Sequence, residues 1–331
     1  MKRRAFITLL GGATAAWPLA ARAQQAERVR RIGVLMSFAA NDPEGQLRIA
    51  AFEKGMRDLG WTEGRNLQIE YRWAPGDAAN LLRSQATELL RTTPDLILAN
   101  STPVTLALQE QGHTVPVVFV QVTDPVGQGL VASLARPGGN LTGFTSFEFS
   151  IGTKWLEMLK VIAPDITRVA LVFNPKTAPF ADLFWRPVEA AASSFDVTAV
   201  SAAARDAAEI ENVLDAFARE PNGGLMVLPD VSTMHHRDLI ITIAARHRLP
   251  AIYPFRSFAA SGGLLSYGTD VSDVFRRAAS YADRILKGAR PGELPVQGPT
   301  KLELVMNLRA AKMLGIAMPP LLLARADEVI E

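Results

Sequence analysis

The chain of 331 residues contains no cysteine and only four histidines. A protein without cysteine has no disulfide framework, no thiolate nucleophile, no cysteine-ligated zinc or iron–sulfur cluster, and no N-terminal cysteine that could carry a lipid anchor. The motifs of a nucleotide-binding P-loop, a zinc-protease helix and a serine-hydrolase elbow are absent as well. We therefore expect no metal and no cofactor, and these patterns do not indicate an enzyme.

Long apolar runs are also missing, since no stretch of about 18 uncharged apolar residues, the length of a membrane-spanning helix, occurs. At the N-terminus, basic residues at positions 2–4 precede a mildly apolar stretch, residues 9–19, and the small residues Ala21 and Ala23 follow. This pattern is typical of a secretory signal, and its arginine pair favours the twin-arginine route, with general secretion as the alternative. The apolar stretch is too short for a membrane anchor. We therefore interpret residues 1–23 as an export signal and expect a soluble periplasmic protein without a lipid anchor.

The full sequence has a formal net charge of +2, but the charge is negative once the export signal is left out. The export signal has four basic residues and no acidic one, so 31 basic residues remain against 33 acidic ones. The exported protein would carry a net charge of −2. It has no excess of basic residues that would favour nucleic acid or an anionic membrane surface, and we expect neither as a partner.

The remaining sequence alternates short apolar runs with amphipathic stretches. Residues 32–36 are typical of a buried strand, and Asp42 followed by Pro43 predicts the start of a helix that ends at Gly60. Further strands are predicted at residues 67–73, 95–99, 116–122, 169–173, 197–200, 225–228, 251–253 and 264–266. Strands and helices alternate in two blocks that separate near residues 143–151. We therefore predict an α/β protein with two doubly wound lobes, each a parallel sheet covered by helices on both faces.

Polar side chains follow the predicted strands. In an open parallel sheet, ligands bind beyond the carboxyl ends of the strands, where helix N-termini present free N–H groups. The candidate ligand-binding residues at these ends are Ser37, Ser101, Thr102, Gln121, Thr123, Asp124, Asn174, Asp230 and Tyr253. Small hydrogen-bonding groups, two carboxylates and one aromatic ring suit a small polar molecule. The same residue types also cap helices, and the two roles are compatible.

Two of these ends predict specific contacts with a ligand. Thr102 is predicted as a helix N-cap, which leaves the amides of Val104 and Thr105 free to bind a ligand carboxylate. Asp230 or Asp124 is the natural partner of a ligand ammonium group.

Several motifs point to one family. They are TDPVG at residues 123–127, SLARPGGNLTG at 133–143, RIGVL at 31–35, GWTEGRN at 60–66, and NLRAAK at 307–312 ahead of Pro319-Pro320. With these motifs the chain resembles the ABC transporter substrate-binding proteins of the tryptophan/tyrosine-binding type, along nearly its whole length after the export signal.

The resemblance implies a type I periplasmic binding protein, with two Rossmann-like lobes that are joined by three crossovers at a hinge and close on a ligand. The first lobe would comprise residues 28–146 and about 271–298, and the second residues 147–270 and about 299–331. Relatives that bind an aromatic amino acid hold it with the loops after the first-lobe strands. Gln121 stands where the family often has a smaller residue, so its amide is expected to narrow or repolarise the cleft.

Three functions are consistent with the sequence. The first is a periplasmic receptor, monomeric, that captures a small polar solute such as an amino acid or a related metabolite and delivers it to the membrane permease of an ABC importer. The second is an enzyme on the same scaffold, with Asp124 and Asp230 as acid and base. The third is a receptor with the same capture step that feeds a sensory system. The lack of a paired nucleophile favours the first.

Overall fold

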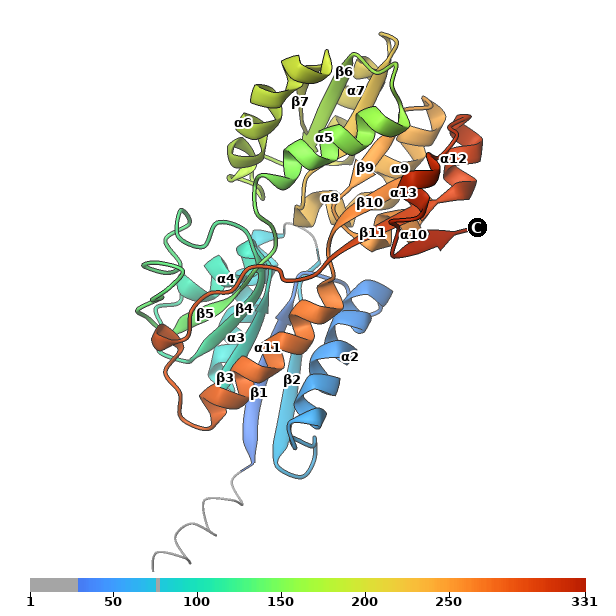
Figure 1. The fold of residues 1–331 in the computed structure, drawn as a ribbon. Helices are drawn as coiled ribbons and strands as arrows, with labels where there is room; N and C mark the ends of the chain where they lie inside the picture. The colour runs from blue at the N-terminus through green and yellow to red at the C-terminus, as the bar shows by residue number, and fades with distance from the viewer. Residues whose placement is uncertain (1–28, 76–77) are drawn as a thin grey trace, which may run out of the picture.

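The computed structural model describes residues 29–75 and 78–331. The predicted export signal, residues 1–23, lies outside the described residues. The described chain forms two α/β lobes, each built around its own sheet, and the lobes lie one above the other in Figure 1. The prediction of two doubly wound α/β lobes is confirmed, whereas the prediction that both sheets are parallel is wrong for the second sheet, in which β10 (Leu265–Thr269) and β11 (Leu302–Asn307) are antiparallel. Within the described part, no helix combines the length and the apolar character that crossing a membrane requires.

The first lobe has a five-stranded parallel sheet in the order β2-β1-β3-β4-β5, with helices on both faces (Figure 1). Its strands are β1 (Arg30–Met36), β2 (Leu67–Trp73), β3 (Leu96–Asn100), β4 (Val117–Val122) and β5 (Leu141–Thr145). Its helices are α2 (Pro43–Asp58), α3 (Ala79–Arg91), α4 (Thr102–Gln109) and α11 (Val271–Leu286). Every residue of β3 is buried, because helices cover both sides of a parallel sheet.

The second lobe has a seven-stranded sheet in the order β12-β11-β10-β9-β8-β6-β7, in which only the pair β10–β11 is antiparallel. Its strands are β6 (Arg168–Phe173), β7 (Thr198–Ala203), β8 (Gly223–Val227), β9 (Ala251–Tyr253), β10 (Leu265–Thr269), β11 (Leu302–Asn307) and β12 (Glu328–Ile330). Its helices are α5 (Ile151–Ile162), α6 (Ala181–Ala192), η1 (Ser193–Phe195), α7 (Ala207–Phe217), α8 (Val231–His235), α9 (Arg237–Arg246), α10 (Arg256–Ala260), α12 (Leu308–Leu314) and α13 (Pro320–Leu323).

Helix α2 begins where its local sequence predicts. The carboxylate of Asp42 accepts a hydrogen bond from the Glu44 amide at 2.8 Å, and Pro43 occupies the first helical position, where a missing N–H costs nothing. Phe52 and Met56 lie one turn apart and are buried in the core. The capped start and the apolar face together fix which side of α2 faces the first sheet.

The chain passes between the lobes three times: between β5 and α5, between β10 and α11, and between the short helix η2 (Pro291–Glu293) and β11 (Figure 1). Hydrogen bonds and an ion pair connect these passages to one another. The Thr269 hydroxyl donates to the Ser146 carbonyl, the Asp270 amide donates to the Lys301 carbonyl at 3.1 Å, and the Lys301 ammonium group lies 2.7 Å from the Asp270 carboxylate. After the second passage, α11 packs against α2 of the first lobe. Three adjacent connecting segments are typical of a hinge between domains that move as units.

We predict that Trp155→Ala lowers the free energy of unfolding by about 3–5 kcal/mol, because it removes a large, fully buried ring. Trp155 stacks on Phe184 with 5.9 Å between ring centroids, and its indole N–H donates to the Tyr267 carbonyl at 2.6 Å. Urea unfolding followed by circular dichroism measures the change. Trp155→Phe is the control, since it keeps an aromatic ring and loses mainly the hydrogen bond. Equal losses in the two variants would contradict the packing argument.

Candidate ligand-binding site

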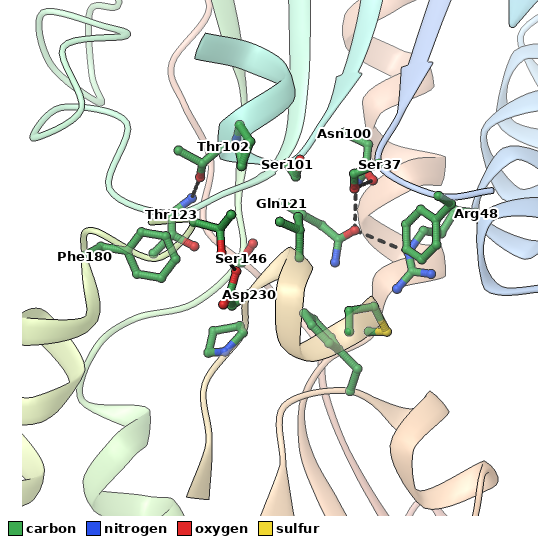
Figure 2. Close-up of a pocket in the computed structure, with 17 residues that line it drawn as sticks. Ser37, Arg48, Asn100, Ser101, Thr102, Gln121, Thr123, Ser146, Phe180 and Asp230 are labelled. Carbon is green, nitrogen blue, oxygen red and sulfur yellow. Dashed lines mark hydrogen bonds between the residues drawn. The ribbon is translucent and has the colours of Figure 1, made fainter. Parts of the chain in front are cut away.

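A cavity lies between the two lobes, and both lobes contribute to its lining (Figure 2). The first lobe contributes Ser37, Phe38, Arg48, Asn100, Ser101, Thr102, Pro103, Gln121 and Thr123 to its lining. Ser146 comes from the first passage between the lobes, and the second lobe contributes Thr177, Phe180, Pro229, Asp230, Val231, Met234 and Phe255. Polar groups dominate the first-lobe wall, whereas most second-lobe residues are apolar.

The position of the cavity follows from the strand order. In both sheets the second strand of the lobe lies on one side of the first strand and the third lies on the other, as β2-β1-β3 and as β7-β6-β8. At such a switch point the loops diverge to opposite faces and leave a crevice beyond the strand ends. Ser37 follows β1 and Ser101 follows β3, while Thr177 and Asp230 come after β6 and β8. Both switch points therefore open into the same cavity.

A chain of hydrogen bonds connects four first-lobe side chains (Figure 2). The Ser37 hydroxyl donates to Asn100 Oδ1 at 2.9 Å, Asn100 Nδ2 donates to Gln121 Oε1 at 2.9 Å, and Arg48 Nε donates to the same Gln121 oxygen at 3.3 Å. Because a guanidinium group can only donate, the Gln121 atom that faces it must be the oxygen. The amide nitrogen of Gln121 is thereby turned away from the network.

Two residues of this network, Asn100 and Arg48, are not among the candidates from the sequence, and of the two only Arg48 lies away from a strand end, on α2. Arg48 is a buried cation. It is 1% exposed, its guanidinium lies 4.6 Å from the centre of the Phe38 ring, and Nη1 lies 3.2 Å from the Glu44 carboxylate. Burial lowers the pKa of Arg48, and the Glu44 carboxylate opposes that effect. A signal was present in the sequence, since Arg48 precedes the apolar Phe52 by four residues, about one helical turn, and therefore lies on the same face of α2.

The start of α4 differs from the prediction in two respects. Ser101, not Thr102, is the N-cap, and the Thr105 amide already donates to the Ser101 carbonyl at 3.1 Å, so only Val104 is left of the two amides that were expected to be free. The physical reason is the backbone of Ser101, whose φ of +87° turns the chain into the helix one residue early. The Thr102 hydroxyl accepts a hydrogen bond from the Thr123 amide at 3.0 Å instead of capping.

Ser101 combines two costly features. Its φ of +87° lies in the region that favours glycine, and its hydroxyl is buried with no hydrogen-bond partner among the described residues. Backbone strain and an unsatisfied buried polar group each destabilise a fold, and strained residues cluster at functional sites. Ser101 lines the cavity, so both features point to a role for this hydroxyl toward a bound molecule.

On the second lobe, Asp230 is held firmly by its neighbours. Its carboxylate accepts hydrogen bonds from the Asn174 amide at 2.9 Å, from the Ser232 amide at 3.1 Å and from the Thr177 hydroxyl. It is 6% exposed and is the N-cap of α8. Asp230 thus ties the loop after β6 to the loop after β8, and Thr177 and Asp230 reach the cavity in a fixed arrangement.

Three predicted site residues lie outside the lining of the cavity. The Asp124 carboxylate accepts a hydrogen bond from the Gly127 amide at 3.0 Å within its own turn. Asn174 is buried and donates to Ser232 at 3.1 Å, so it supports Asp230 from behind. Tyr253 is 1% exposed and stacks on Phe258 in the core of the second lobe. The other six, Ser37, Ser101, Thr102, Gln121, Thr123 and Asp230, meet in the cavity.

Beside the cavity, the lobes touch through an ion pair. Arg237 Nη1 of α9 lies 3.5 Å from the carboxylate of Asp42, which precedes α2. Both side chains are about four-fifths buried, with 18% and 20% of their surface exposed. The lobes are therefore in contact along the edge of the cleft. Residues 29–75 and 78–331 contain no cluster of three or more acidic, histidine or cysteine side chains that could hold a metal ion.

Comparison with known proteins gives a consistent result. The family model described as "ABC transporter substrate binding protein" matches residues 37–330. A tyrosine-binding protein from Clostridioides difficile is 26% identical over 280 residues, which are 84% of this chain and 80% of the relative. The structure of a conserved domain protein from Vibrio cholerae is 28% identical with a TM-score of 0.84, and the match covers 91% of this chain and all of that one. The structure of an ABC domain from Streptococcus pneumoniae in complex with L-tryptophan has the same TM-score and coverage at 22% identity.

We predict that Ser101→Gly raises the free energy of unfolding of the solute-free protein by about 1 kcal/mol or more, because glycine tolerates a positive φ and removes the unpaired hydroxyl. Ser101→Ala removes the hydroxyl but keeps a side chain at the same φ, and is expected to gain less. Urea unfolding of the three proteins measures the order. A glycine variant no more stable than the alanine variant would show that the backbone of Ser101 is not strained.

Proposed function

This chain belongs to the ABC transporter substrate binding protein family, and from that premise we propose that it is an exported receptor which captures a small polar solute between its lobes and presents it to the permease of an ABC importer. The observation that carries the proposal is the cavity at the facing switch points of both sheets, lined by polar groups from each lobe. A solute that contacts both lobes stabilises the closed arrangement, because only that arrangement makes both sets of contacts.

The proposed contacts on the first lobe come from Ser37, Ser101, Thr102, Gln121 and Thr123. These side chains offer hydroxyl and amide groups at the strand ends, close to the N-terminus of α4, whose dipole favours an anionic group. Closure would remove water from these contacts and strengthen them.

The proposed contacts on the second lobe come from Asp230 with Thr177 and from the apolar Phe180 and Phe255. The two aromatic side chains give the solute an apolar surface to pack against. One protein named above is a tyrosine-binding protein, and another was solved in complex with L-tryptophan, so amino acids are the first solutes to test.

The proposed movement is a rotation of two lobes about the three bonded passages. The first lobe would comprise residues 28–146 and about 271–298, and the second residues 147–270 and about 299–331. Sheet membership supports this division, as does the packing of α11 on α2. We propose a monomer in the periplasm, whose closed form is recognised by the permease.

We further propose that the solute is released chemically unchanged. The family comprises substrate binding proteins. The enzyme alternative requires Asp124 and Asp230 to face each other as acid and base, whereas the Asp124 carboxylate bonds within its own turn and lies outside the cavity lining. This placement supports capture and delivery.

A thermal-shift screen of amino acids and other small metabolites, followed by calorimetry, tests the proposed site. We expect Thr102→Ala and Asp230→Asn each to weaken binding of the solute found by about tenfold, since each change removes a hydrogen-bonding group that positions the cavity wall. Circular dichroism of both variants controls for folding. If both bind with unchanged affinity, the cavity between the lobes is not the binding site.

The ion pair between Asp42 and Arg237 is expected to favour the closed arrangement. Asp42→Asn keeps an N-cap for α2 but removes the charge, and we predict a two- to fivefold loss of solute affinity, about what a partly exposed ion pair contributes. Calorimetry at low and high salt measures it. Asp58→Asn is the matched control, because Asp58 pairs with Lys54 on the surface of the same helix. Equal affinities of the two variants would mean that the pair does not bias closure.

A further inference from the structure

We propose that the solute is a small dicarboxylate, with one carboxylate held by Arg48 and Gln121 and the other by Ser101 at the start of α4. The inference rests on the proposed function, because it concerns the same cavity. It follows from the direction of the hydrogen bonds in the first-lobe wall. The amide oxygens of Asn100 and Gln121 already accept hydrogen bonds from protein groups, so the groups left for a solute are mainly donors.

Gln121 shows this imbalance most directly. Its oxygen accepts from both Asn100 and Arg48, while its amide nitrogen, which carries two N–H groups, has no acceptor among the described residues. Figure 2 shows this nitrogen pointing into the cavity. Gln121 is also held at a φ of +58°, where the ladder between β4 and β5 shifts register. The backbone strain thus places an amide donor where a bound molecule can reach it.

Arg48 adds a positive charge beside that donor. Of its five N–H groups, one from Nε goes to Gln121 and one from Nη1 goes to Glu44. The remaining donors belong to a side chain that lines the cavity and is 2% exposed, so few of them reach bulk water. The guanidinium carbon also lies 4.6 Å from the centre of the Phe38 ring, a cation–π contact that helps to hold the side chain in place. A planar fork of donors matches a carboxylate, which can accept two parallel bonds.

The charges of the lining leave a place for an anion at this end of the cavity. Arg48 and Asp230 are the charged residues among the lining side chains, and Asp230 belongs to the opposite lobe, where three protein donors already bond to it. Glu44 shares Arg48 but is not part of the lining. A solute carboxylate would therefore meet a buried cation and an amide donor without facing an acidic side chain on the same wall.

The second carboxylate fits the start of α4. The Ser101 hydroxyl is 6% exposed and unpartnered among the described residues, and it lines the cavity next to the first turn of α4. A hydroxyl donor at a helix N-terminus favours an anionic acceptor. Both ends of the first-lobe wall thus present donors, and a molecule with an acceptor-only group at each end satisfies both.

The test compares saturated dicarboxylates of three to six carbons with their monoamides, and with L-tyrosine and L-tryptophan, by thermal shift and calorimetry. We expect one dicarboxylate to bind at least about tenfold more tightly than its monoamide. Gln121→Glu should weaken that dicarboxylate by at least about tenfold, because the variant keeps the acceptor for Arg48 and Asn100 but turns a negative oxygen toward the solute. Gln46→Glu is the matched control: it adds the same charge to the exposed surface of α2, and the affinity should stay within about twofold.

Arg48→Lys tests the geometry of the guanidinium apart from its charge, since lysine keeps the positive charge but cannot form two parallel hydrogen bonds with a carboxylate. A loss of affinity for the dicarboxylate in this variant supports bidentate binding. The inference is overturned if no dicarboxylate binds, or if Gln121→Glu binds the dicarboxylate as tightly as the unaltered protein. Binding of an aromatic amino acid in place of every dicarboxylate would overturn the inference while the proposed function stands. The proposed function fails separately if a solute binds and neither Thr102→Ala nor Asp230→Asn affects it.

Discussion

The carboxyl ends of two parallel sheets face each other across one cavity, and the rest of the structure serves this arrangement. A parallel sheet collects the ends of its strands at one edge, where helices begin and backbone donors are free. Three bonded passages of the chain hold the two edges opposite each other, and α11 returns to the first lobe to complete it. The polar loops are therefore brought together by topology, although they come from distant parts of the sequence.

The balance of donors and acceptors decides what this cavity can hold. On the second lobe, the Asp230 carboxylate accepts hydrogen bonds from Asn174, Thr177 and Ser232, which fix its position in the cavity wall. On the first lobe, the Gln121 side-chain oxygen accepts hydrogen bonds from Arg48 and Asn100, and its side-chain nitrogen faces the cavity. A wall of donors beside a buried arginine selects molecules rich in acceptors, because an unpaired buried donor is costly.

Periodicity and turn chemistry were enough to predict the elements that position the site, including β1, the capped start of α2 and the strand ends that carry Ser37 and Thr123. Side-chain direction was not predictable from strand ends alone. Tyr253 turns into the core and Asn174 braces Asp230, whereas Phe255 reaches the cavity, because packing within the second lobe decides these orientations. Arg48 was not predictable from strand ends because it lies on a helix, and a charged side chain on a helix is mostly exposed to solvent.

Small-angle X-ray scattering of the protein with and without a saturating solute tests the central claim most directly. If the two lobes close on the solute, the radius of gyration falls on binding, and the fall is reversed when the solute is dialysed away. An unchanged scattering profile under conditions where calorimetry shows full occupancy would contradict capture by closure.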